Sequence, residues 1–261
     1  MSIKSITNLC VLMIVATLGL SGCSAINKIT SGILPMETSA LTPAGGSEDY
    51  QQAISQFTEQ YQSNPGDLSA VLGLSRNLRY SGDAKTALGI LGEAQDQFAN
   101  KTDYQSELGK VRLANGDIAG AQASLEKAIS LAPNSTDNWH AYAALGVVYD
   151  LLRTFDRAQS AYDKAFSACS SSISLRNNMA ISAGMSGDPK KALRLLRDLG
   201  REVPAEPTVA RNIRLFEDMS EQCVDCTSQQ YQDIASSIYA PGAGAITDEM
   251  VCDEPKSEMV A

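Results

Sequence analysis

The side chains that could perform catalysis are few. His140 is the only histidine among the 261 residues, and it directly follows Trp139. No serine or cysteine stands at a spacing that would fix it beside His140 as a nucleophile with its general base. The chain also lacks a glycine-rich phosphate loop, and no pair of carboxylates stands out from its general acidity. We therefore predict that His140 is a groove or surface histidine, and that the protein is not an enzyme and has neither a cofactor nor a small-molecule substrate.

Cysteines are the second set of residues with chemical potential. Cys223 and Cys226 form a Cys-x-x-Cys pair, which can bind zinc, exchange disulfides or close a structural disulfide. A zinc site needs two further ligands at regular spacing, and neither a second such pair nor a histidine follows. A redox pair is expected at a helix start within a βαβ unit, which this chain lacks. A structural disulfide is therefore the preferred prediction, and no metal site is expected.

The N-terminus has the pattern of an export signal. Lys4 precedes an apolar run over residues 9–20, and small residues follow it. At about a dozen residues this run is shorter than the ~20 that span a bilayer. A transmembrane anchor is the alternative, and the length of the run argues against it.

The end of this signal resembles the bacterial lipobox over residues 20–23 (LSGC). In that motif the cysteine receives a diacylglycerol, the signal is cut before it, and the new amino group is acylated. The resemblance implies that residues 1–22 are a lipoprotein signal peptide and that Cys23 anchors the chain in the membrane. Serine at position 24, in place of aspartate, implies transfer to the outer membrane, with the domain facing the periplasm. Residues 23–46 are then a lipidated tether, since they mix small, polar, Pro and Gly residues without helical period.

Composition limits the class of protein. The chain carries 30 acidic and 21 basic residues, for a formal charge of -9. Such a balance lacks the cationic footprint that nucleic-acid binding requires. A hydrophobic fraction of 44% excludes wholesale disorder, and the abundance of alanine and leucine favours close-packed helices.

An internal repeat organises these helices. Three Gly-Asp dipeptides, at 82–83, 116–117 and 187–188, each have an alanine four residues after the aspartate, and the first two of these are 34 residues apart. A period of this length is typical of helical repeat arrays. An alanine-rich bundle without repeats is the alternative, but binary patterning alone does not place Gly-Asp at a fixed offset.

The repeat resembles the tetratricopeptide repeat (TPR). Residues 102–135 carry the pattern Leu108-Gly109, Gly116-Asp117, Ala121, Leu125, Ala128 and Pro133. The resemblance implies an all-α fold, a right-handed superhelix (α-solenoid) of stacked helix pairs. Four units are predicted, at 68–101, 102–135, 139–172 and 173–206. A half repeat at 47–67 precedes them, and capping helices at 207–240 and an acidic flexible tail at 241–261 follow.

The third unit departs from the pattern in two ways. It has Arg153-Thr154 where the Gly-Asp turn belongs, and its phase requires an insertion at 136–138.

In the TPR architecture, fixed positions of each first helix line a concave groove for the ligand. The resemblance places these groove residues at Leu72, Arg76, Arg79, Tyr80, Ser106, Lys110, Val147, Asp150, Asn177, Ile181 and Met185. We call them the predicted groove residues. They grade from basic to apolar, so we expect the basic end to hold a carboxylate-bearing segment of a protein partner and the apolar end to receive its apolar side chains. A solvated face without a ligand is the alternative.

The repeat phase also bears on the cysteines that remain after export. Cys169 lies near the end of its unit's second helix, whereas Cys223 lies where the array would make its next turn. A helix of about 14 residues, roughly 20 Å long, separates these ends, which disfavours a direct bond. Cys223 with Cys226 is the simplest pairing, and Cys252 then remains to bond with Cys169.

A lipobox, a short tether, four TPR units and a cap together resemble the TadD family, the lipoproteins of tight-adherence (Flp) pilus assembly. The residues that carry this resemblance are Arg176-Asn177-Asn178-Met179-Ala180, followed by Gly187-Asp188 and Lys191-Ala192. The interrupted last repeat and the cysteine-bearing tail depart from the general pattern. The resemblance implies a pilotin-like scaffold that binds the secretin, the outer-membrane channel of the pilus. The alternative is a TPR adaptor lipoprotein for type IV pili, outer-membrane biogenesis or peptidoglycan enzymes.

Overall fold

The computed structural model describes residues 47–222, which contain eleven α-helices, one short 3-10 helix and no strand. The helices are α2 (Ser47–Ser63), α3 (Leu68–Tyr80), α4 (Ala84–Glu93), α5 (Gln95–Phe98), α6 (Thr102–Ala114), α7 (Ile118–Leu131), η2 (Thr136–Asn138), α8 (Trp139–Leu151), α9 (Phe155–Ala168), α10 (Ile173–Met185), α11 (Pro189–Glu202) and α12 (Pro207–Gln222). Over this part of the chain, the predicted all-α fold is confirmed.

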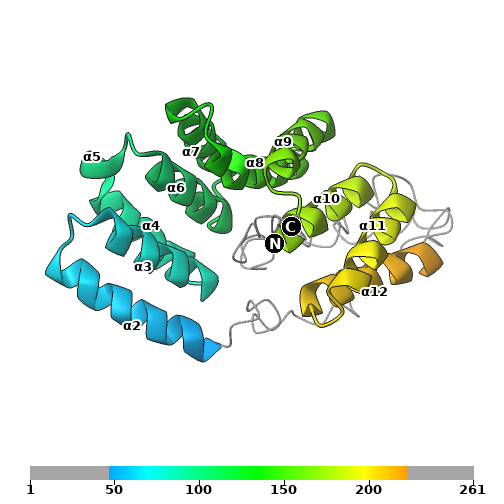
Figure 1. Ribbon diagram of the computed structural model, residues 1–261, viewed down its shortest axis with the longest axis horizontal. Helices are drawn as coiled ribbons and strands as arrows, with labels where there is room; N and C mark the ends of the chain where they lie inside the picture. Colours follow the sequence, from blue (N-terminus) through cyan, green and yellow to red (C-terminus); the bar gives the residue numbers. More distant parts are fainter. Residues whose placement is uncertain (1–46, 223–261) are drawn as a thin grey trace, which may run out of the picture. The chain divides into compact units, whose positions relative to one another are not determined.

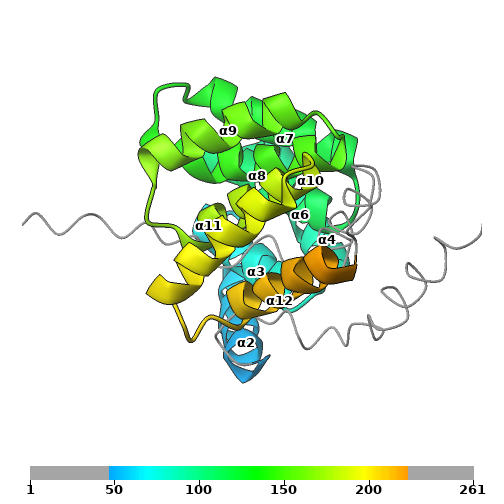
Figure 2. The same ribbon diagram turned by 90° about the vertical axis from the view of Figure 1, so that its right-hand side faces the viewer.

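The helices pack as pairs in sequence order (Figure 1). The pairs are α3 with α4, α6 with α7, α8 with α9, and α10 with α11. The first helices of successive pairs also contact one another, α3 with α6, α6 with α8, and α8 with α10. Figure 2 shows α8, α9 and α10 lying side by side, as these contacts require. This nearest-neighbour stacking is that of a TPR α-solenoid.

The turns within the pairs explain the Gly-Asp motif. Gly116 has φ +78°, a left-handed conformation that favours glycine. The side chain of Asp117 then caps α7, where it accepts a hydrogen bond from the backbone N–H of Gly120 at 2.9 Å. In the third unit, Arg153 adopts the same left-handed region with φ +56°, and Thr154 makes no side-chain bond to cap α9. The turn therefore keeps its shape although the motif residues are replaced.

Small residues bring the two helices of a pair together. A Cβ atom added at Gly146 would lie 2.3 Å from the Tyr162 ring, and one at Gly109 would lie 2.5 Å from Leu125. Ala121 and Ala158 on the second helices are fully buried. Packing of the two helices within each pair thus depends on close approach at fixed repeat positions.

Several sequence predictions lie outside the described residues and stay predictions. These are the signal peptide 1–22, lipidation at Cys23, the tether 23–46, the end of the cap at 223–240, the tail 241–261, and Cys223, Cys226 and Cys252. Between residues 47 and 222, no helix combines the length and the apolar character that crossing a membrane would require.

Candidate protein-binding face

The predicted groove residues divide into an accessible group and a buried group. Those on α3 and α6 are exposed or half-buried, with the exception of Arg79; they are Leu72, Arg76, Tyr80, Ser106 and Lys110. Those on α8 and α10 are buried; they are Val147, Asp150, Asn177, Ile181 and Met185.

The apolar half of the groove is therefore not the exposed surface that the sequence suggested. Val147, Ile181 and Met185 are each 0% exposed. The physical reason is that these three side chains are apolar and pack among α8, α10 and the helices that contact them, which removes their surface from water. These three side chains are core residues, and the expectation that they are open to a partner was wrong.

Asp150 is likewise internal and links two units. Its carboxylate accepts hydrogen bonds from the Tyr162 hydroxyl at 2.9 Å and from the Ser182 hydroxyl at 2.7 Å. Burial raises the pKa of Asp150 to about 7, although both hydrogen bonds act in the opposite direction. The carboxylate thus joins α8 to α9 and α10 and does not face a ligand.

Asn177 has a similar part in the next unit. Its side-chain carbonyl accepts a hydrogen bond from Asn212 Nδ2 on α12 at 2.9 Å, and both residues are buried. Asn177, which was predicted to line the groove, therefore connects α10 to α12 through this hydrogen bond.

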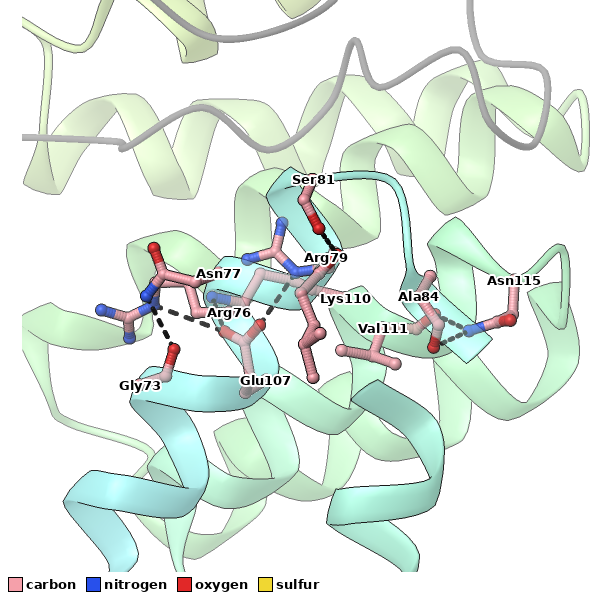
Figure 3. Close-up of polar contacts among 11 residues, drawn as sticks. Gly73, Arg76, Asn77, Arg79, Ser81, Ala84, Glu107, Lys110, Val111 and Asn115 are labelled. Atoms are coloured by element: carbon pink, nitrogen blue, oxygen red, sulfur yellow. Dashed lines mark hydrogen bonds and ion pairs between the residues drawn. The ribbon is translucent and has the colours of Figure 1, made fainter. Parts of the chain in front are cut away.

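The basic half of the groove is brought together by a residue that was not predicted. Figure 3 shows Arg76, Arg79 and Lys110 converging on the carboxylate of Glu107. Arg79 Nε donates to Glu107 Oε1 at 2.8 Å, and Lys110 Nζ lies 2.8 Å from Oε2. Arg76 Nε lies 3.8 Å from the same Oε2. We call these four residues the cation cluster.

Burial differs sharply among the four members. The side chains of Arg79 and Glu107 are each 1% exposed, that of Lys110 is 11% exposed, and that of Arg76 is 49% exposed. Burial alone would raise the pKa of Glu107, but Arg79 and Lys110 hold it well below its usual range, so Glu107 is ionised. The pKa of Lys110 is lowered by burial, with Glu107 opposing and the two arginines contributing.

Arg79 is only partly satisfied. Its terminal nitrogens Nη1 and Nη2 are buried, and no hydrogen-bond partner for them lies within residues 47–222. Its guanidinium lies over the ring of Tyr80, with Cζ 4.5 Å from the ring centroid, and Tyr80 in turn packs against Tyr50 of α2. Cation–π contact with Tyr80 compensates part of the lost hydration of Arg79.

His140 lies within the electrostatic reach of this cluster. The pKa of His140 is lowered to about 4, mainly by burial. The positive charges of Lys110 and Arg76 also lower this pKa, and the negative charge of Glu107 opposes them. The imidazole is therefore neutral at pH 7, and it stacks on Trp139 with ring centroids 3.8 Å apart. The sequence analysis predicted a groove or surface histidine at this position. It did not predict that the cations Lys110 and Arg76 lie close enough to lower the His140 pKa.

Sequence signals for the missed residues exist but are weak. Glu107 precedes Lys110 by three residues, a spacing that places the two on one helix face. It falls between the groove positions of its repeat, so its role in gathering cations from two helices requires the packing of α3 against α6.

Cys169 is disulfide-bonded and 1% exposed. Because Cys223, Cys226 and Cys252 lie outside the described residues, the predicted pairing stays a prediction. In the described part of the chain, no group of three or more His, Cys, Asp or Glu residues is placed to hold a metal ion.

Comparison with known proteins agrees with this geometry. Residues 103–135 and 140–171 match the tetratricopeptide repeat model, so both segments are TPRs. They correspond to α6 with α7 and to α8 with α9. Repeats of this kind are typically protein-interaction scaffolds without catalytic activity of their own.

Similar folds are found among solved structures. A thermophilic TPR protein of Thermus thermophilus is similar with a TM-score of 0.56 at 19% identity, over 66% of this chain and 91% of that one. A TPR protein from Parabacteroides merdae aligns with a TM-score of 0.49 at 14% identity, over 85% and 90% of the two chains. YrrB, described as a TPR protein with an unusual peptide-binding site, aligns with a TM-score of 0.44 at 17% identity, over 71% and 93%. No curated protein is significantly similar to the chain.

Proposed function

We propose that this protein is an outer-membrane lipoprotein whose TPR solenoid is a scaffold for assembly of a tight-adherence pilus, where it binds the secretin. The observation that carries the scaffold function is the pair of matched TPRs within a stacked solenoid. The pilus and the secretin come from the resemblance to the TadD family, through the lipobox at residues 20–23 and the residues 176–180 of the fourth unit.

The accessible part of the predicted groove is the surface proposed to contact the partner. Arg76 is its most exposed charged member, and Leu72 and Ser106 are half-buried beside it on α3 and α6. Positive charge here contrasts with the net charge of -9 of the chain. Complementary charge raises association rates and selects against wrong partners.

Affinity capture of the full chain from detergent-solubilised membranes tests the assignment. We expect a secretin as the main partner of the wild type, and a peptidoglycan enzyme in its place would favour the adaptor alternative. Arg76→Glu is expected to reduce capture at least severalfold, since it reverses an exposed charge on this face. Arg194→Glu is the matched control, because Arg194 is exposed on α11 and forms no ion pair within residues 47–222.

Membrane attachment is tested separately by Cys23→Ala. If Cys23 is the lipid anchor, this change should leave an unprocessed precursor that incorporates no palmitate, because no thiol remains to accept the diacylglycerol. Palmitate labelling that persists unchanged in the variant would contradict the proposed anchor.

A further inference from the structure

We infer that the exposed side of α11 is a docking surface for a bilayer of anionic phospholipid. The surface combines a row of cations with two neighbouring apolar side chains. Its members, which we call the basic face, are Lys190, Arg194, Arg197, Arg201, Phe166 and Leu195. This inference rests on the lipid anchor of the proposed function, because the anchor would hold the domain at the membrane that the basic face contacts. The surface is separate from the predicted groove, which lies on the first helices of the pairs.

The first argument is the concentration of positive charge on α11. Residues 190–201 include five basic residues and one acidic residue, although the whole chain has 21 basic and 30 acidic residues. The cations of the basic face follow one another at intervals of four, three and four residues, which places them on one side of the helix. All four are exposed. They therefore form one accessible row, about 16 Å long at the rise of an α-helix.

Acidic neighbours compensate only part of this charge. Arg197 pairs with Glu217 of α12 at 2.7 Å, and Arg201 pairs with Asp198. Lys190 and Arg194 form no ion pair with any residue between 47 and 222. Exposed ion pairs contribute little to stability, so Arg197 and Arg201 can exchange their partners for lipid phosphates at small cost.

The second argument is the exposed apolar surface beside the row. Phe166 of α9 and Leu195 of α11 are 40% and 39% exposed. Both line one open pocket, to which Arg201 also contributes. The two carboxylates at this pocket, those of Asp198 and Glu202, are each paired with an arginine. Apolar and cationic side chains thus meet at a single surface.

This combination favours a bilayer over a protein partner or bare solvent. Basic residues next to exposed phenylalanine or leucine are typical of helices at the membrane interface, where the cations contact phosphates and the apolar side chains enter the edge of the acyl region. On the opposite side of α11, Ala192, Leu196 and Leu199 are buried, so the helix stays within the solenoid while its outer side contacts lipid. The predicted tether 23–46 reaches about 25 Å as a flexible coil, which allows the domain to lie against the membrane.

The experiment places the processed, lipidated chain on preformed vesicles and measures how fast its lysines react with acetic anhydride, an uncharged reagent. One vesicle is pure phosphatidylcholine, and the other contains about one third phosphatidylglycerol. We expect Lys190 and Lys191 to react at least fivefold more slowly on the anionic vesicle, and Lys85 and Lys101, which are exposed on other parts of the solenoid, to react equally on both. About 1 M salt should remove the protection, since it screens charges beyond roughly 3 Å.

Variants separate the charge from the apolar contact. Arg194→Gln should lower the ratio of docked to free domain about fivefold, because each cation near an anionic surface contributes a factor of this size; Arg194→Lys should retain most of the protection. Lys85→Gln is the matched control, with the same charge removed from α4. Phe166→Ser should lower the ratio severalfold, and Leu152→Ser is its control, because Leu152 is 46% exposed at the end of α8. Circular dichroism checks that each variant retains its fold.

Three outcomes would overturn the inference. The first is equal reactivity of Lys190 and Lys191 on the two vesicles. The second is protection that is the same on neutral lipid, which would mean that another part of the chain covers the basic face. The third is unchanged protection in Arg194→Gln.

Failure of the basic face is distinguishable from failure of the proposed function. If the chain floats with both vesicles but its lysines are not protected, the anchor stands and the basic face fails. If it floats only with anionic vesicles, the basic face stands and the anchor fails. Capture of a secretin is measured in detergent, where no bilayer is present, so Arg194→Glu remains a valid control in that experiment.

Discussion

Replacement of Glu107 by glutamine should destabilise the solenoid strongly, because this carboxylate is the only anion that the cation cluster contains. Glutamine keeps nearly the same shape and removes the charge. The amide oxygen of glutamine can still accept a hydrogen bond from Arg79 Nε. Arg79, whose side chain is 1% exposed, would nevertheless lose its opposite charge, and Lys110 would lose its ion pair at 2.8 Å.

The magnitude follows from the burial of these groups. Breaking a buried ion pair by removing one partner typically costs about 3–5 kcal/mol, because an uncompensated charge stays behind in the interior. With a urea m-value of about 2 kcal/mol/M, this lowers the unfolding midpoint by roughly 2 M. An exposed ion pair of the same protein serves for comparison: the side chains of Arg157 and Glu126 are 55% and 45% exposed. Glu126→Gln should cost no more than about 1 kcal/mol.

Urea unfolding followed by circular dichroism, with Glu126→Gln as the control, measures both effects. The pH dependence provides a second check. The folded-state pKa of Glu107 lies well below its usual value of 4.5, so its stabilisation is fully present above that value and is lost as the pH falls below it. The difference between the wild type and Glu107→Gln should therefore be constant above about pH 5.5 and should shrink in acid. A Glu107→Gln midpoint within experimental error of the wild type at pH 7 would refute the account of the cation cluster.

Three further changes test the fold. Ala121→Leu should lower the melting midpoint by an amount equivalent to about 1–3 kcal/mol, since Ala121 is fully buried where α7 meets α6; an unchanged midpoint would show that the contact is loosely packed. Thr154→Asp should stabilise the protein by about 1 kcal/mol in urea unfolding, because it supplies the missing side-chain cap of α9; no gain would show that the local turn cannot accommodate the bond. Asp150→Asn should change how the free energy of unfolding depends on pH, because burial raises the Asp150 pKa to about 7 from its ordinary value of 3.8. The contribution of Asp150 to wild-type stability is full below about pH 4. It is lost as the pH rises through 7, by up to roughly 4 kcal/mol. The stability difference between Asp150→Asn and the wild type should accordingly grow with pH between 4 and 7, and a flat difference would contradict the burial of an uncompensated carboxylate.

The turns show how far a local motif predicts structure. Gly-Asp predicted a tight turn because glycine tolerates the left-handed conformation and aspartate caps the following helix, and Gly116 and Asp117 do both. The motif could not predict that Arg153 takes the same conformation without glycine. At this turn the packing of α8 against α9 fixes the path of the chain. The shape of the turn therefore follows from tertiary packing, and the backbone strain arises because Arg153 is not a glycine.

The groove residues show where repeat phase stops being informative. Phase predicts which residues share one side of each first helix, and three of the residues it named, Arg76, Arg79 and Lys110, lie near one carboxylate in Figure 3. Exposure is a different quantity, because it depends on how closely the next helices pack. Val147 on α8 occupies the same repeat position as Arg76 and Lys110 but is 0% exposed. No rule of position within a repeat distinguishes these cases without the neighbouring helices.

Charge at the two ends of this face follows the same physical logic. Where α3 and α6 leave a side chain partly in water, an arginine or lysine can remain ionised, and a single buried glutamate suffices to hold the cations together. On α8 these positions are buried, where an unpaired cation would be costly, and the apolar Val147 or the hydrogen-bonded Asp150 occupies them instead. Among the predicted groove residues, the change from basic to apolar therefore follows the change from accessible to buried side chains, and the accessible cations Arg76 and Lys110 lie on α3 and α6.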